Sequence, residues 1–181
     1  MRIISGTHKG KIITPDKNFK ARPTTDFAKE NLFNVLNNYI DIEDASVLDL
    51  FAGTGSISYE FASRGAGKIV SIELNYNHYA FIKKTATQLG FKNMTIFKTD
   101  VFIACKKLNG TTFDIIFALL TTWKKSTRFR LPFSITIYWP RTESPLSNTP
   151  APWTSPRNPT FSNTAGTVVL ISRSSKDNKQ T

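Results

Sequence analysis

The chain has 181 residues, a single cysteine and a formal net charge of +11. This length suits one domain with one sizeable core, and the absence of any run of about 18 apolar residues argues against a membrane-spanning helix. The N-terminus lacks the apolar segment of a signal peptide, and the lone Cys105 excludes a disulfide framework, so we expect a cytoplasmic protein with no bound metal.

The positive charge is concentrated in the last third of the chain. Residues 1–117 carry 15 basic and 11 acidic residues, whereas residues 118–181 carry nine basic residues and only two acidic ones. Seven of the nine prolines also follow residue 117. The surplus charge favours a nucleic-acid partner, and the abrupt change in composition divides the chain into two parts, 1–117 and 118–181.

The first elements are a hairpin and a helix. Residues 2–4 and 11–14 are short β-prone runs, and Gly6 and Gly10 suit the turn between them. Asp26 is the expected N-cap of a helix whose apolar positions recur at helical spacing from Ala28 to Tyr39.

Strands then alternate with helices as far as residue 117. We expect strands at 47–51, 68–72, 95–98 and 113–117, and helices at 57–63, 79–89 and 102–108. This alternation is typical of βαβ units and predicts an α/β fold with a parallel sheet. Beyond residue 117 the runs SITIY and TVVLI are strand-like, but no helix is expected between them.

The segment VLDLFAGTGSIS, residues 47–58, carries the strongest local signal. A buried strand leads into a turn where Gly53 and Gly55 allow a ligand to approach the main chain, and Asp49 lies at the strand's carboxyl end. The segment is neither GxGxxG nor a P-loop. An acid beside the glycines favours a cationic ligand, such as the sulfonium and amino group of S-adenosylmethionine. A turn needed only for tight packing is the simpler alternative.

Two further acids follow the next two strands. Glu73, about 20 residues beyond the glycines, suits the hydroxyls of a ribose. Asp100 suits the exocyclic amine of an adenine, with Val101 or Phe102 lying against the ring. Each acid alone would be a solvated residue at a strand end. Three of them at successive carboxyl ends predict one binding crevice.

The segments RIISGTHKG, RPTTDFAKENLFNVL, VLDLFAGTG, SIELN and KTDVF, in this order and spacing, resemble the RsmD family of bacterial small-subunit ribosomal RNA guanine-N2 methyltransferases. The resemblance covers residues 1–117 and implies a Rossmann-like class I fold with S-adenosylmethionine as cofactor. It also implies an N-terminal hairpin that helps to engage RNA, and a monomer that acts on ribosomal RNA or the assembling small subunit. Phe27 departs from the family, which usually has a basic residue there.

The resemblance also implies two sets of contacts. Cofactor contacts are expected from Asp49, Phe51, Ala52, Gly53, Thr54, Gly55, Glu73, Leu74, Asp100 and Val101. RNA contacts are expected from Arg2, Lys9, Lys11, Arg22, Pro23 and Thr24, mostly through phosphates. Taken singly, each basic residue is better explained as a solvated surface charge.

The family's catalytic loop is missing from the sequence. In such methyltransferases the fourth strand ends in Asp/Asn-Pro-Pro-Tyr/Phe, which orients the acceptor amine and stacks on the flipped base. Here Ala118, Leu119, Leu120, Thr121 and Thr122 contain no acid, amide, proline or aromatic ring. We therefore expect no catalytic residue, impaired activity, and a sheet whose C-terminal strands and helices are missing or disordered.

A changed reading frame explains this loss. Trp has the single codon TGG, so each Trp fixes part of the message when the codons are read one base earlier. In that frame Trp123-Lys124 requires Glu, and Trp139-Pro140 requires Ala. Residues 118–125 can read P-P-Y-Y-L-E-K in that frame, which restores the prolines and the tyrosine. We interpret residues 118–181 as an out-of-frame translation and expect the neighbouring frame of the coding DNA to continue the family. A basic tail that evolved to bind RNA is the alternative.

The sequence therefore predicts an impaired methyltransferase of the RsmD type. A non-catalytic remnant that binds S-adenosylmethionine or RNA is the second hypothesis. A DNA adenine methyltransferase would share the cofactor site, but the RIISG and RPTTD segments argue against it.

Overall fold

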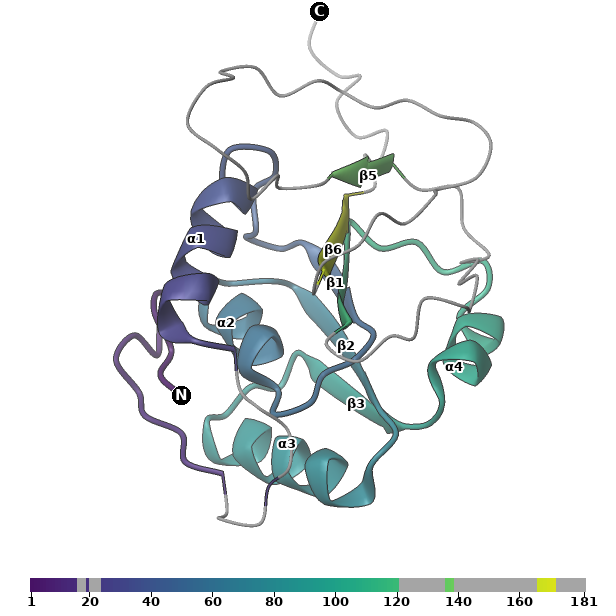
Figure 1. The fold of residues 1–181 in the computed structure, drawn as a ribbon, viewed down its shortest axis with the longest axis horizontal. Helices are drawn as coiled ribbons and strands as arrows, with labels where there is room; N and C mark the ends of the chain where they lie inside the picture. Colours follow the sequence, from purple (N-terminus) through teal and green to yellow (C-terminus); the bar gives the residue numbers. More distant parts are fainter. Residues whose placement is uncertain (16–18, 20–23, 121–135, 139–165, 172–181) are drawn as a thin grey trace, which may run out of the picture.

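The computed structural model describes residues 1–15, 19, 24–120, 136–138 and 166–171 (Figure 1). Its strands are β1 (Ser46–Asp49), β2 (Lys68–Glu73), β3 (Met94–Lys98), β4 (Ile115–Leu120), β5 (Thr136–Tyr138) and β6 (Gly166–Ile171). Its helices are α1 (Asp26–Leu36), α2 (Ser56–Ser63), α3 (Tyr76–Gln88) and α4 (Val101–Lys107). Strands and helices alternate from β1 to β4, as the sequence predicts.

Within this part of the chain the strands form one sheet in the order β3-β2-β1-β4-β6-β5. β1 is parallel to β2 and β4, and β2 is parallel to β3. β6 is antiparallel to both β4 and β5. The predicted α/β fold with a parallel sheet is confirmed for β1 to β4. The run SITIY contains β5 and the run TVVLI makes up most of β6, so two antiparallel strands extend the sheet where we expected the C-terminal strands to be missing.

The helices are divided unequally between the two faces of the sheet. Helices α1, α2 and α3 share one core with the sheet, through side chains such as Phe33, Phe61 and Ile82. On the other face α4 packs through Ala104 and Cys105, and it is the one helix on that side in the described ranges (Figure 1). Cys105 is thus a core residue, as expected. None of the described helices is long and apolar enough to cross a bilayer.

The N-terminal residues form the expected hairpin, although regular pairing is limited to one antiparallel bridge between Arg2 and Ile12. The Ile3 N–H donates to the Lys11 carbonyl at 3.0 Å and holds the two arms together. Ile3 and Ile13 are both buried in the core beside α1 and α2. The hairpin is therefore packed against the domain.

Helix α2 is buried along its whole length, and its polar side chains bind the hairpin. The Glu60 carboxylate accepts hydrogen bonds from the main-chain N–H groups of Ile4 (2.8 Å) and Ser5 (3.0 Å), and it pairs with Arg64 at 2.9 Å. The Ser63 hydroxyl donates to the Ser5 carbonyl at 2.6 Å. Because a buried carboxylate without donors is costly, α2 and the hairpin stabilise each other.

Helix α1 differs from its prediction at both ends. Its N-cap is Thr25 rather than Asp26, because the Thr25 hydroxyl accepts a hydrogen bond from the Ala28 N–H at 3.2 Å. The helix ends at Leu36, before the expected Tyr39. Since Asp26 is the first helical residue, its carboxylate is available for the hairpin.

Helix α3 begins three residues earlier than the periodicity of its apolar residues predicts. The Asn75 side chain accepts hydrogen bonds from the N–H groups of Asn77 (2.9 Å) and His78 (3.3 Å), so the helix starts at Tyr76 and not at Tyr79. A side-chain cap satisfies the first N–H groups of a helix, which apolar spacing does not reveal.

Strand β4 continues past its expected end at residue 117. β1 pairs with it only as far as Asp49 opposite Phe117, but residues 118–120 stay in the strand and pair with residues 166–168 of β6. A β-prone partner across the sheet therefore decides where this strand ends.

Replacing Glu60 with Gln keeps the size of the side chain but removes the charge shared with Arg64 and two main-chain N–H groups. We expect the free energy of unfolding to fall by about 2 kcal/mol in urea denaturation. The control is Glu30→Gln, the same change at an exposed position of α1, with an expected cost below about 0.5 kcal/mol. Equal costs in the two variants would show that these bonds do not stabilise the protein.

Candidate cofactor-binding site

Three carboxylates lie at the carboxyl ends of adjacent parallel strands. Asp49 ends β1, Glu73 ends β2, and Asp100 follows β3 by two residues. Asp49 is in register with Ser71, and Glu73 with Lys98. The three acids therefore follow the same edge of the sheet, which is the edge where open α/β sheets bind ligands.

The Asp49 side chain is buried, with 1% of its surface exposed. Burial raises its pKa from 3.8 to about 6, and the negative charge of Glu73 acts in the same direction. Its Oδ2 accepts a hydrogen bond from the Ser58 hydroxyl at 2.6 Å, which opposes the rise, and Ser58 Oγ lies 2.8 Å from Ser71 Oγ. The Ser58 hydroxyl thus holds one oxygen of the carboxylate, and Ser71 in β2 holds the Ser58 hydroxyl.

The other oxygen, Oδ1 of Asp49, is buried and makes no hydrogen bond of good geometry with the residues that the structure describes, although the main-chain N–H of Phe51 also acts to lower the pKa of this carboxyl. A buried carboxylate oxygen without a donor is costly, and a ligand that donates to it removes that cost. The amino group of S-adenosylmethionine is such a donor. This side chain therefore fits the cofactor that the sequence resemblance implies.

The Glu73 carboxylate is fixed by three neighbours. It accepts hydrogen bonds from the main-chain N–H groups of Gly53 and Asn75, each at 2.8 Å, and His78 Nδ1 lies 3.6 Å away. Its two oxygens have lone pairs beyond these bonds, which suits the hydroxyls of a ribose. His78, which the sequence gave no role, also stacks on Phe19 with 4.2 Å between ring centroids. Phe19 itself therefore lies on the same side of the site as His78 and Glu73.

Asp100 is the N-cap of α4, and its Oδ1 accepts a hydrogen bond from the Phe102 N–H at 2.8 Å. Of the two residues expected beside an adenine, Val101 packs into the core, whereas the Phe102 ring is 46% exposed. Leu74, directly after β2, is 64% exposed. The exposed side chains of Phe102 and Leu74 therefore offer apolar contact at this edge.

The glycine turn has the backbone that its sequence predicts. Gly53 (φ 56°) and Gly55 (φ 76°) are in the left-handed region that favours glycine. A Cβ on Gly55 would lie 2.6 Å from the Tyr59 ring, whereas one on Gly53 would meet only a carbonyl at 3.9 Å. The structure therefore requires glycine at 55 and leaves space at 53. The other expected contacts are the half-buried Phe51 and the buried Ala52 and Thr54.

The residues expected to contact RNA are only partly described. Lys9 and Lys11 are exposed at the turn of the hairpin, where phosphates can reach them. Thr24 is half-buried directly before the N-cap of α1. Arg22 and Pro23 lie outside the described residues.

Arg2 belongs to a cluster that joins the hairpin to α1. Its side chain is 55% exposed and pairs with Asp26 at 3.4 Å. The buried Lys29 donates a hydrogen bond to the Arg2 carbonyl and lies 3.7 Å from Asp26, and burial lowers the pKa of Lys29. Sequence analysis missed Lys29, although its spacing from Phe33 and Leu36 places it on the buried face of α1.

Strand β4 takes the place of the catalytic loop that is typical of the family. Residues 118–120 lie in β4, paired with β6, and their side chains are all apolar. Thr121 and Thr122 lie outside the described residues. The described part of this segment therefore has no side chain that could accept a hydrogen bond from an amine.

Sequence analysis also missed Ser58, which binds Asp49, and Ser71, which binds Ser58. One signal was present: Ser71 interrupts the apolar run IVSIE at the position in register with Asp49. A small polar residue inside a buried strand usually has a polar partner on a neighbouring element.

Gly55→Ala should lower the free energy of unfolding by more than about 2 kcal/mol, because the methyl group meets the Tyr59 ring and the backbone is left-handed. The matched control is Gly90→Ala. Gly90 has a similar φ of 71° but no atom within 4 Å of its Cβ position, so it tests the backbone effect alone. A thermal or urea denaturation series measures both, and equal losses would show that the Tyr59 contact is unimportant.

Asp49→Asn should stabilise the ligand-free protein near neutral pH. The pKa of Asp49 is raised from 3.8 to about 6, so the stability due to its protonated form is complete below 3.8 and lost as pH rises through about 6. From about pH 8 to about pH 5 the unchanged protein should gain about 1 kcal/mol relative to the variant. Urea denaturation across this range measures the difference. Parallel pH profiles would show that Asp49 titrates normally.

Comparisons with known proteins identify the family of this chain. The family model described as "Conserved hypothetical protein 95" matches residues 1–118. "Ribosomal RNA small subunit methyltransferase D" of Buchnera aphidicola is 35% identical over 115 residues, which are 64% of this chain and 59% of that protein. The protein of the same name from Escherichia coli K12 is 34% identical over 119 residues, 65% of this chain and 58% of that protein. The chain thus spans about three fifths of these relatives.

Solved structures show the same fold. "Putative methyltransferase yhhF" from Escherichia coli superimposes with a TM-score of 0.61 and 18% identity, over 94% of this chain and 96% of that one. The Thermus thermophilus hypothetical protein TTHA0928 gives a TM-score of 0.57 and 17% identity, over 68% of this chain and 89% of that one. With its match to the family model over residues 1–118 and its relatives of that name, the chain belongs to the Conserved hypothetical protein 95 family, that of ribosomal RNA small subunit methyltransferase D.

Proposed function

We propose that this chain binds S-adenosylmethionine at the carboxyl edge of its sheet and derives from a methyltransferase of small-subunit ribosomal RNA. The observation that carries the proposal is the buried, unpartnered Oδ1 of Asp49 beside a glycine turn. The names of the relatives, which describe ribosomal RNA methyltransferases, support it.

Each acid would hold one part of the cofactor. Asp49 would accept a hydrogen bond from the amino group of the methionine moiety, and Glu73 would accept the ribose hydroxyls. Asp100 would accept the adenine amine, and the exposed ring of Phe102 would lie against the base. The cofactor supplies an electrophilic methyl group on a sulfonium. The residues of this chain orient it and keep the crevice negative, which favours a cation.

The substrate would be an exocyclic amino group of a guanine in small-subunit ribosomal RNA. Lys9 and Lys11 are exposed on a hairpin that Glu60 fixes to α2, so they would approach RNA phosphates from a rigid base. Phe19, which stacks on His78 beside Glu73, would lie near the cofactor. These contacts would position the RNA and not select its sequence.

We further propose that methyl transfer is impaired. Transfer to an amine needs an acceptor that orients its lone pair towards the methyl group, and a misplaced acceptor costs about 10²-fold in rate. Residues 118–120 continue in β4 and offer apolar side chains in the place of such an acceptor. The match to the family model ends at residue 118, which supports a changed reading frame at this point.

A non-catalytic protein that binds the cofactor or RNA is the second candidate. The continuation of β4 through residues 118–120 favours this candidate. The acids and the glycine turn of the crevice are present, whereas β4 occupies the place of the loop that would present the acceptor. The two candidates differ only in the methyl transfer that remains.

Calorimetry with S-adenosylhomocysteine tests the cofactor site. Binding should be saturable, should weaken as pH falls below about 6 because Asp49 becomes protonated, and should fall about tenfold or more in Asp49→Asn. Asp44→Asn is the matched control, because Asp44 is an exposed acid outside the crevice. Binding that is independent of Asp49 would refute the proposed site.

Transfer of a labelled methyl group to small-subunit particles tests the reaction, with the Escherichia coli relative as the positive control. We expect cofactor binding with a rate at least about 10²-fold below that of the relative. No measurable transfer would favour the non-catalytic candidate. A rate equal to that of the relative would refute the impairment.

A further inference from the structure

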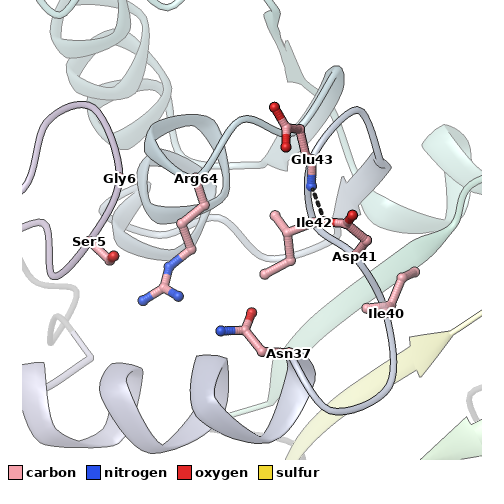
Figure 2. A pocket seen from close by; sticks show the side chains of 8 residues that line it. All are labelled: Ser5, Gly6, Asn37, Ile40, Asp41, Ile42, Glu43 and Arg64. Carbon is pink, nitrogen blue, oxygen red and sulfur yellow. Dashed lines mark hydrogen bonds between the residues drawn. The ribbon is translucent and has the colours of Figure 1, made fainter.

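A second cavity lies at the opposite edge of the sheet from the cofactor crevice. It has a volume of about 570 Å³ and is formed by the hairpin turn, the end of α1, the loop before β1 and the end of α2 (Figure 2). Helix α2 starts at the glycine turn and ends at this cavity, so the two sites are about 12 Å apart along eight helical residues. The cavity is therefore separate from the crevice, and its volume is within the range of small-molecule sites.

An arginine is fixed at the inner wall of the cavity. The Arg64 side chain is only 11% exposed, and its Nε donates to the Glu60 carboxylate at 2.9 Å. One face of its guanidinium lies over the Phe33 ring, 4.4 Å from the centroid. Within the described ranges its terminal nitrogens have no recorded hydrogen bond, and Figure 2 shows them pointing into the cavity towards Asn37. Arg64 thus presents two parallel donors in a fixed orientation.

The remaining walls supply acceptors and an apolar surface. Figure 2 shows the Asn37 amide directed into the same space as Arg64, with Ser5 on one side and Ile42 facing them. Asp41 lies across the cavity, where one of its carboxylate oxygens accepts a hydrogen bond from the Glu43 N–H at 3.1 Å. The second oxygen is left for a ligand. A planar ligand would therefore meet donors on one side, acceptors on the other, and an aliphatic side chain.

The charges around the cavity argue against a simple anion. Arg64 is already paired with the buried Glu60, and Asp41 and Glu43 add two further negative charges. A phosphate would be repelled by this surplus, and a lysine or arginine side chain of a partner has no acceptor for the donors of Arg64. The best match is a neutral ring with two adjacent acceptors on one edge and two adjacent donors on another.

We infer that this cavity binds a guanine base, held between Arg64 and Asp41. Guanine presents its O6 and N7 acceptors together, which suit the fork of Arg64, and its N1–H and N2 amino donors together, which suit a carboxylate. Adenine places a donor beside N7 and has no such donor pair. The inference deepens the proposed function, because the base would belong to an RNA substrate and would lie far from the methyl-transfer crevice. An unpaired nucleotide inserted here would fix the RNA against the hairpin and α2.

Titration of the intact chain with GMP, IMP and AMP tests the inference. GMP should bind about tenfold tighter than AMP, and IMP should bind with intermediate affinity, because it lacks only the N2 amino group. The Nε–H signal of Arg64 and the amide signal of Asn37 should shift in nuclear magnetic resonance spectra. Excess S-adenosylhomocysteine should leave the GMP affinity unchanged. Equal affinity for GMP and AMP, or no binding of either, would overturn the inference.

Two variants assign the binding to this cavity. Asp41→Asn keeps the acceptor for the Glu43 N–H but replaces the carboxylate, and it should weaken GMP binding about tenfold. Asp44→Asn removes the same charge three residues away, outside the cavity, at a left-handed position (φ 58°) that asparagine tolerates. Identical GMP affinities in the two variants would overturn the inference.

The variants also separate this inference from the proposed function. Both should bind S-adenosylhomocysteine normally, since neither residue lies near the crevice. If GMP binding depends on Asp41 but no methyl group is transferred, the guanine site stands and the transferase fails. If ribosomal RNA is bound and methylated equally well by Asp41→Asn, the transferase stands and the guanine site is refuted.

Discussion

The complete burial of helix α2 is the constraint on which the rest of the structure depends. A buried polar group is costly without a partner, and three polar side chains of this helix find theirs on other elements of the fold. Ser58 reaches Asp49 and Ser71 in two strands, whereas Glu60 and Ser63 bind the main chain of the hairpin. One short helix therefore connects the cofactor edge of the sheet to the N-terminal segment. A structural change at the cofactor edge or at the hairpin therefore acts on the other through the eight residues of α2.

The cofactor crevice keeps an unfavourable state that a ligand can relieve. Asp49 is buried with one oxygen unpartnered, and burial raises its pKa to about 6. Perturbed carboxyls of this kind gather at functional sites, because a protein gains nothing from them in the absence of a ligand. Glu73 differs from Asp49, because two main-chain N–H groups donate to its carboxylate and it needs no ligand to be stable. In the proposed function, the affinity for the cationic cofactor would therefore depend mainly on Asp49 at the end of β1.

Much of the fold and crevice could be predicted from the sequence. The alternation of apolar strands with helices gave the sheet, and the acids at 49, 73 and 100 fell at strand ends because backbone geometry fixes where a parallel strand stops. Side-chain caps could not be inferred from apolar spacing, so the starts of α1 and α3 were misplaced. The burial of Lys29 and Glu60 depends on contacts with residues 27 to 56 positions away in the chain. The guanine cavity joins four separate segments, and no local pattern marks it.

The antiparallel partner of β4 has a consequence for how this chain is made. β4 can pair with β1 as soon as both have left the ribosome, but the residues of β6 that cover its outer edge follow 46 positions later in the sequence. At ordinary rates of translation this delay lasts a few seconds. For that time an apolar strand has one row of unsatisfied amides and carbonyls, a ready template for another nascent polypeptide. Synthesis of this chain should therefore depend on holding chaperones more than its size suggests.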